Sequence, residues 1–228
     1  MDRREFTGQL AAGMALWVGA AQARALSLSD ADASAGLKEA LQRGAVAAVG
    51  LLGKTDGFLG NPKVRIPLPS GLKSAAKLLE GLGQGDKVKE LVTSMNRAAE
   101  AAVPESRQLL SDAVSQMTVT DAKKILTGGD TSVTQFFADK TRMPLGEKFL
   151  PIVTTQTEKV DLANKYNAVA SKASGFGLVK KEDANVQQYV TRKALDGLYF
   201  MIGEEEKKIR KDPVGTGSAL LKKVFGAL

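Results

Sequence analysis

The sequence predicts an all-α protein: a single-domain bundle of several helices with one short extended strap. Three observations predict this class. Apolar residues recur at helical spacing along most of the chain, helix-capping and helix-breaking residues separate these runs, and no strand-rich region, internal repeat or low-complexity tract occurs. The 228 residues, less a cleaved leader, suffice for one domain with a full hydrophobic core.

Residues 1–25 are typical of an export signal. Two arginines precede an uncharged, apolar run that ends in the small-x-small sequence Ala-Arg-Ala at 23–25. The order Arg-Arg-x-Phe resembles a twin-arginine signal, whereas Asp2 and Thr7 depart from that pattern and leave Sec export as the rival. We therefore expect a periplasmic protein, cleaved after Ala25, with one all-α domain over 26–228; an uncleaved anchor is the alternative.

The sequence pattern in the first half of this domain predicts four helices. Residues 29–52 begin with N-cap candidates and then place leucines and valines at near-helical spacing. Residues 70–82 and 86–103 predict two more helices, separated by a Gly-rich turn. A proline then starts the segment 104–117, whose apolar residues form one core-facing stripe.

Capping signals organise the next two helices. Thr118, with Asp121 three residues later, predicts a capping box for a short helix that ends at Gly128. Asp130 is the expected cap of the helix that follows, whose face contains Val133 and two phenylalanines.

Three further helical segments are expected toward the C-terminus. Helical pattern resumes over about 145–174 and again over 182–212, which we expect to be the longest uninterrupted helix. Residues 218–228 repeat apolar side chains on one face and predict a short amphipathic helix. Because such a helix is too short to be stable alone, we expect it to dock on the core, with weak contact to a membrane surface as the alternative.

The stretch 56–69, DGFLGNPKVRIPLP, interrupts the helical pattern. Its three prolines and two glycines prevent a helix and favour turns and extended backbone. The alternation places Val64, Ile66 and Leu68 on one side. We expect an ordered strap over the helical core, and these three side chains are candidate ligand-binding residues, either at the border of a groove or at an edge open to a partner strand.

Two polar constellations are the other candidate ligand-binding residues. Glu206 and Arg210 lie one helical turn apart at the edge of an apolar stripe, either as an ion pair that bounds the core or as one wall of a polar pocket. Asn96 and Glu100 share a helix face, with Arg97 beside them, among alanines that permit close packing. If the two segments meet, they form a buried Asn/Glu/Arg network.

Composition excludes many function classes. Cys and His are both absent, which excludes disulfides, Ser-His-Asp and Cys-His catalysis and the usual zinc sites. The net charge of +7 is interspersed, and aromatic residues make up 5% of the chain, which argues against nucleic-acid binding. We predict no cofactor, no metal and no catalytic residue.

Several segments, taken in order, resemble a known family. They are DGFLGNPKVRIPLP, MNRAAEAAVP, MTVTDAKKIL, GGDTSVTQFF and YVTRKALDGLYFMIGEEEKKIRKDP. Together they resemble a bacterial family of exported proteins catalogued only as a domain of unknown function, family 4197, over about residues 28–226. The resemblance implies a helical envelope protein and transfers no site residues.

These observations favour a non-catalytic periplasmic binding or interaction protein of the cell envelope. It would hold an apolar ligand, or a partner protein of the envelope, between its helices and the strap. The alternative, from another class, is a carboxylate-dependent hydrolase of an envelope polymer, with a protonated Glu206 as general acid.

We predict that the exported protein begins at Leu26, because Ala25 completes the only well-placed small-x-small site before the first capped helix. N-terminal sequencing of the periplasmic protein checks this. Retention of Met1 in the membrane fraction would contradict the cleaved, periplasmic assignment.

Overall fold

The computed structural model describes residues 30–129, 131–177 and 179–212, together with 215, 218, 219 and 222. Within these residues the regular structure is helical, without a strand. In chain order the elements are α1 (Asp30–Leu52), α2 (Ser70–Gly81), α3 (Gly85–Ala102), the 3₁₀ turn η1 (Val103–Ser106), α4 (Arg107–Ser115), α5 (Val119–Thr127), α6 (Ser132–Thr157), α7 (Asp161–Gly175), the 3₁₀ turn η2 (Lys181–Asp183) and α8 (Val186–Lys211). This confirms the predicted all-α bundle.

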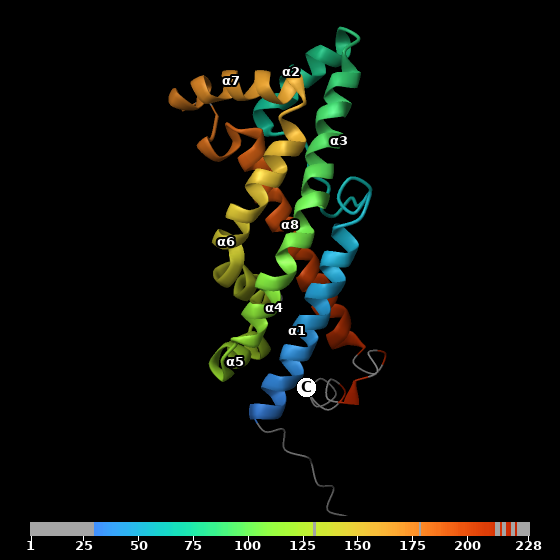
Figure 1. Cartoon of the computed structure of the whole chain (residues 1–228), viewed down its shortest axis with the longest axis vertical. Coiled ribbons are helices and arrows are strands. Elements are labelled where there is room, and N and C mark those ends of the chain that lie inside the picture. The colour runs from blue at the N-terminus through green and yellow to red at the C-terminus, as the bar shows by residue number, and fades with distance from the viewer. Residues whose placement is uncertain are drawn as a thin grey trace, which may run out of the picture.

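The long helices α1, α3, α6 and α8 run along the long axis of the molecule (Figure 1). Helix α8 packs against α1, α3 and α6, and α3 also packs against α6. The short helices lie at the ends of this arrangement, with α2 and α7 across one end and α4 and α5 toward the other (Figure 1). The core therefore surrounds α8, which packs against more of the long helices than any other long helix does.

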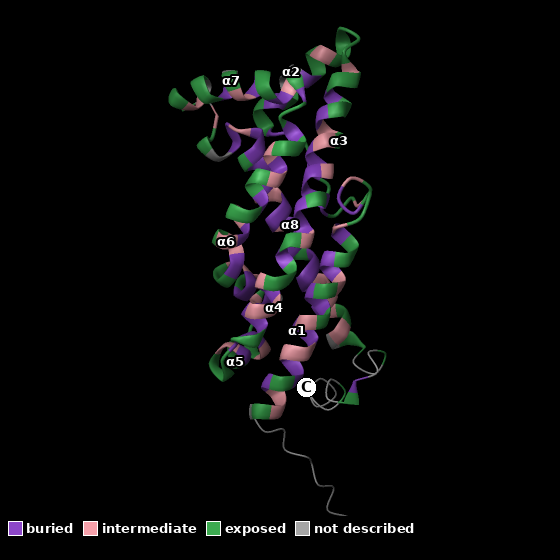
Figure 2. Ribbon diagram, viewed as in Figure 1, coloured by how far each residue is buried: buried purple, intermediate pink, exposed green. Residues whose placement is uncertain are grey.

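Most buried residues follow the faces that the sequence pattern predicts, but Val46 of α1 is 61% exposed (Figure 2). Large side chains that are almost completely buried come from α1, the strap, α3, α6 and α8. They include Leu37, Leu41, Phe58, Leu91, Met95, Phe137, Phe149 and Tyr199. In α3, Ala98, Ala99 and Ala102 are fully buried, and such small residues let helices approach closely.

Helix α6 is continuous where the sequence predicted two segments. It contains Pro144 and Pro151 in its interior, and each proline removes one backbone donor. The buried face continues through both positions, with Leu145, Phe149 and Val153 all fully buried. Burial of this face outweighs the local loss, because tertiary packing supplies most of a helix's stability.

The prediction of one helix over 145–174 is wrong at its middle. Helix α6 ends at Thr157, and α7 begins at Asp161 after a turn. At this corner the Asn164 side chain donates to the carbonyl oxygen of Glu158, 2.9 Å away, which satisfies an acceptor near the end of α6.

Helix α8 begins four residues later than predicted, because the Asn185 side chain caps it by accepting from the Gln188 N–H at 3.0 Å. At 26 residues it equals α6 in length, so it is not the single longest helix. The capping box of Thr118 and Asp121 at the start of α5 is confirmed.

Most residues of the two terminal segments lie outside those that the structure describes. The leader 1–25 and the expected cap Asp130 lie outside the described residues, as does most of 218–228. Ser218 is buried, and its hydroxyl donates to the Glu39 carboxylate of α1 at 2.9 Å. Among the helices that the structure describes, none has the length and apolar character needed to cross a membrane.

The strap over 56–69 lies against the core as predicted. Phe58, Val64 and Ile66 are buried in the core, and Leu68 is half-buried against it. Close approach to α8 requires Gly197, since a Cβ atom there would lie 2.8 Å from the Phe58 ring and 3.3 Å from the Val64 Cβ. The strap therefore closes the core beside α8.

We predict that Gly197→Ala destabilises the protein by about 1–3 kcal/mol, because the new methyl group overlaps the Phe58 ring. Gly146→Ala is the matched control, since it is also a helix interior position and a Cβ there meets no atom within 4 Å. The control should be neutral or stabilising by helix propensity. Urea unfolding midpoints compare the two; equal midpoints would contradict the tight contact between strap and α8.

Candidate functional site

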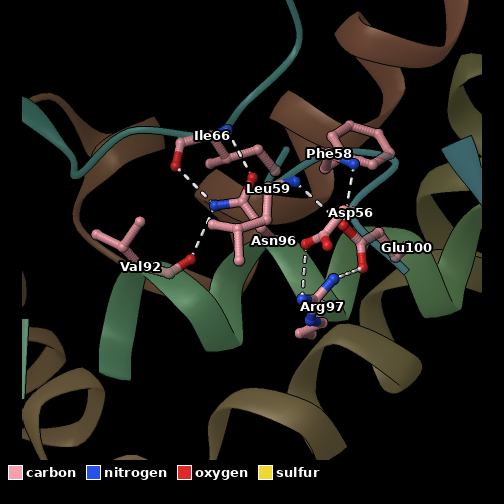
Figure 3. Close-up of polar contacts among 8 residues, drawn as sticks. All are labelled: Asp56, Phe58, Leu59, Ile66, Val92, Asn96, Arg97 and Glu100. Carbon is pink, nitrogen blue, oxygen red and sulfur yellow. Dashed lines mark hydrogen bonds and ion pairs between the residues drawn. The ribbon is translucent and has the colours of Figure 1, made fainter. Parts of the chain in front are cut away.

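Asn96 of α3 binds the strap through its amide side chain (Figure 3). Its Oδ1 accepts from the backbone N–H of Ile66 at 2.8 Å, and its Nδ2 donates to the Ile66 carbonyl at 3.0 Å. The same Nδ2 donates to the Val92 carbonyl of α3 at 2.8 Å. The side chain thus pairs with both backbone groups of Ile66, as a neighbouring β-strand would.

Glu100, one turn further along α3, binds the strap near its start (Figure 3). Its Oε1 accepts from the backbone N–H groups of Phe58 and Leu59, at 2.9 and 3.1 Å. Its Oε2 accepts from Arg97 Nη1 at 2.6 Å. Glu100 is buried, and burial of a carboxylate is costly without such donors, so these three donors explain why it is tolerated.

Arg97 links this carboxylate to the beginning of the strap (Figure 3). Its Nη2 donates to Asp56 Oδ1 at 2.8 Å. The hydrogen bonds with Glu100 and then Asp56 raise the pKa of the Arg97 guanidinium above its usual range. Asp56 has a φ of 64°, the left-handed region in which non-glycine residues are uncommon. We call Asn96, Arg97 and Glu100 the α3 clasp.

Helix α8 holds the strap from another side. The Tyr189 hydroxyl donates to the Pro67 carbonyl at 3.0 Å, and burial raises the pKa of this phenol to about 12, so it keeps its proton at neutral pH. Lys63 Nζ lies 2.8 Å from Glu204 Oε2, and this hydrogen bond lowers the pKa of the Glu204 carboxyl. The strap is therefore fixed on both sides.

The structure brings some of the predicted residues together and separates others. The α3 clasp meets the segment that contains Val64, Ile66 and Leu68, but its hydrogen bonds and ion pairs go to the strap or stay within α3. The suggested network with Glu206 is therefore not formed. Glu206 is buried on α8 beside Gly44 of α1, and the Arg210 side chain lies outside the described part of the chain.

A groove of about 340 Å³ opens between the strap and α8, and we call it the strap groove. Its lining residues are Lys63, Val64, Arg65, Ile66 and Pro67 from the strap, and Lys193, Asp196, Gly197 and Phe200 from α8. It includes two of the predicted ligand-binding residues, Val64 and Ile66. It does not include Leu68, the α3 clasp or Glu206.

The strap groove is cationic with one apolar wall. Lys63 is paired with Glu204, and Asp196 with Arg142 of α6 at 2.9 Å. Arg65 is exposed and Lys193 half-buried, and neither has a carboxylate partner among the residues that the structure describes. Phe200 leaves 41% of its surface exposed. Such a groove can receive an anionic group and an apolar group together.

Sequence reasoning missed the exposed half of this groove. The alternation that buries Val64 and Ile66 also requires Lys63 and Arg65 to point outward, so the strap cations could have been predicted. No local signal brings Lys193 or Phe200 beside them. In the described ranges, no cluster of three or more Asp and Glu residues could hold a metal ion.

We predict that Asn96→Ala destabilises the protein by about 2–4 kcal/mol, because it leaves the buried N–H and C=O of Ile66 without partners. Asn164→Ala is the matched control: it removes one exposed hydrogen bond and should cost less than about 1 kcal/mol. Urea denaturation measures both variants. Similar costs would show that the clasp is not needed to hold the strap.

Neither the curated proteins nor the solved structures contain a match to the chain. The family described as protein of unknown function (DUF4197) matches residues 27–226, a span that contains the helices, the strap and the α3 clasp. The chain therefore belongs to the DUF4197 family, as its segments led us to expect.

Proposed function

We propose that this chain is a non-catalytic binding protein of the cell envelope, and that its strap groove receives an extended acidic segment of a partner protein. The observation that carries the proposal is the presence of Arg65 and Lys193, without carboxylate partners in the described residues, beside the exposed face of Phe200. The periplasmic location rests on the predicted leader 1–25.

The groove is preformed. Residues 58–67 are tied to α3 through Asn96 and Glu100 and to α8 through Tyr189. A partner would therefore not need to order the strap when it binds. Preorganisation of this kind supports affinity, because binding otherwise costs the entropy of fixing a loop.

The groove chemistry favours an acidic segment over an enclosed apolar ligand. The apolar strap side chains Phe58, Val64 and Ile66 are buried in the core beneath the strap. What remains accessible is cationic, and the whole chain carries a net charge of +7. Complementary charge speeds the encounter of two proteins and selects among partners.

The hydrolase alternative has no observation in its favour. A general acid must face the substrate in a groove, and Glu206 does not line the strap groove. The carboxylate that does line it, Asp196, is held in an ion pair with Arg142. A binding function therefore fits the strap groove better than hydrolysis does.

We predict that a fluorescein-labelled acidic peptide, Asp-Glu-Phe-Asp-Glu, binds the wild-type chain at low salt. The double variant Arg65→Glu/Lys193→Glu should bind about tenfold or more weakly, because it reverses both free charges of the groove. Fluorescence anisotropy measures the affinities.

The matched control is Lys73→Glu/Lys77→Glu. It makes the same change in net charge at two exposed positions of α2 that are remote from the groove lining. The control should lose less than about threefold in affinity. Equal losses in the two double variants would show attraction by net charge alone, and absence of peptide binding would contradict the proposal directly.

A further inference from the structure

A second groove, distinct from the strap groove, lies between α6 and α8. These two helices run side by side and make the most extensive helix–helix contact of the described chain (Figure 1). The groove has a volume of about 280 Å³. Its lining residues are Arg142, Gly146 and Leu150 from α6, and Gln188, Thr191, Arg192 and Leu195 from α8.

Thr191 has an unusual environment within this groove. It is 7% exposed, yet its hydroxyl has no hydrogen-bond partner among the described residues. Other buried helical threonines donate to a carbonyl four residues earlier, as Thr141 does to Phe137 at 2.7 Å and Thr157 does to Val153 at 2.8 Å. A buried hydroxyl is costly unless a water or a ligand bonds to it, so the Thr191 hydroxyl is available to an acceptor that enters the groove.

The neighbouring residue has a second such atom. Arg192 Nε is buried and has no partner in the described part of the chain. An arginine Nε–H can only donate, and a threonine hydroxyl can donate. One kind of ligand atom satisfies both groups, namely an oxygen that accepts hydrogen bonds.

The charges of the groove are already balanced. Arg142 pairs with Asp196, and Arg192 pairs with Asp183. Each guanidinium also lies over a tyrosine ring, Arg142 at 5.2 Å from the Tyr199 centroid and Arg192 at 5.4 Å from the Tyr189 centroid. Because each cation has its own carboxylate, a neutral acceptor such as an amide carbonyl fits better than an added anion.

The groove continues into a region rich in amide side chains. Leu150 and Gln188 also line an adjoining groove of about 360 Å³ at the junction of α6, α7 and α8. Its other lining residues are Thr154, Glu158, Asn164, Asn167, Asn185 and Gln187. Asn and Gln side chains can both donate to and accept from a peptide backbone. Asn164, Asn167, Asn185 and Gln187 already use part of this capacity in hydrogen bonds within the chain. Neither of these two adjoining grooves is lined by an aromatic ring that would stack on a sugar.

We propose that the α6–α8 groove binds a short uncharged peptide segment. A backbone carbonyl of the segment accepts from Thr191 and Arg192, and an apolar side chain packs between Leu150 and Leu195. The Gln188 side chain, which lines both adjoining grooves, pairs with the next backbone amide of the peptide. This site does not depend on the strap groove, because the two grooves share no lining residue.

The test is an NMR titration of the folded chain with the neutral peptide acetyl-Ala-Leu-Ala-amide at concentrations up to about 10 mM, the range suited to weak ligands. Amide signals of Gln188, Thr191 and Leu195 should shift. Octanoate is the comparison ligand. A larger response of the same signals to octanoate would assign the groove to aliphatic carboxylates and overturn the peptide class.

Thr191→Val removes the hydroxyl and keeps the shape. It should weaken peptide binding about fivefold or more, and leave the urea midpoint of the free protein unchanged or higher. Thr157→Val is the matched control: it removes a hydroxyl that has a partner, so its midpoint should fall while peptide binding stays within about twofold.

Two results would overturn the proposal. One is that the peptide shifts no signal of the groove. The other is that Thr191→Val lowers the midpoint as much as Thr157→Val does, because the Thr191 hydroxyl would then have a partner in the free protein.

Discussion

The hydrogen bonds from the side chains of α3 to the backbone of the strap are the interaction on which the rest of the structure depends. The three prolines and two glycines of the strap disfavour a helix, and no neighbouring strand supplies its backbone with partners in the described chain. The side chains of Asn96 and Glu100 supply these partners instead. They form hydrogen bonds with the backbone of Phe58, Leu59 and Ile66. Buried backbone groups without such partners are strongly unfavourable. The polar side chains of α3 thereby allow an irregular segment to complete an apolar core.

The clasp also determines what the strap presents to solvent. With Val64 and Ile66 directed into the core, the alternation of an extended chain directs Lys63 and Arg65 outward. These cations then meet Lys193 and Phe200 of α8 across the strap groove. A site on a rigidly held loop needs little reorganisation to bind, which is why the same contacts support both stability and the proposed recognition.

Much of this fold could be predicted from the sequence, because periodicity and capping are local. The all-α class, the capping box at Thr118 and the buried side of the strap were all predicted. Asn96 and Glu100 were selected as polar residues on a packed helix face, but their partners lie 30 to 42 residues away in the chain, and no local pattern shows such a distance. The continuity of α6 through Pro144 and Pro151 was missed for the same reason, since long-range burial outweighs local propensity.

Helix α8 connects the two proposed binding surfaces. Residues 193, 196, 197 and 200 line the strap groove, and residues 188, 191, 192 and 195 line the α6–α8 groove. The two sets interleave along one helix, and the ion pair between Asp196 and Arg142 joins a residue of one groove to a residue of the other. Since α8 packs against α1, α3 and α6, it cannot turn to favour one groove without disturbing the core. The two grooves therefore have fixed relative positions, and a partner that engages both must match that spacing rather than induce it.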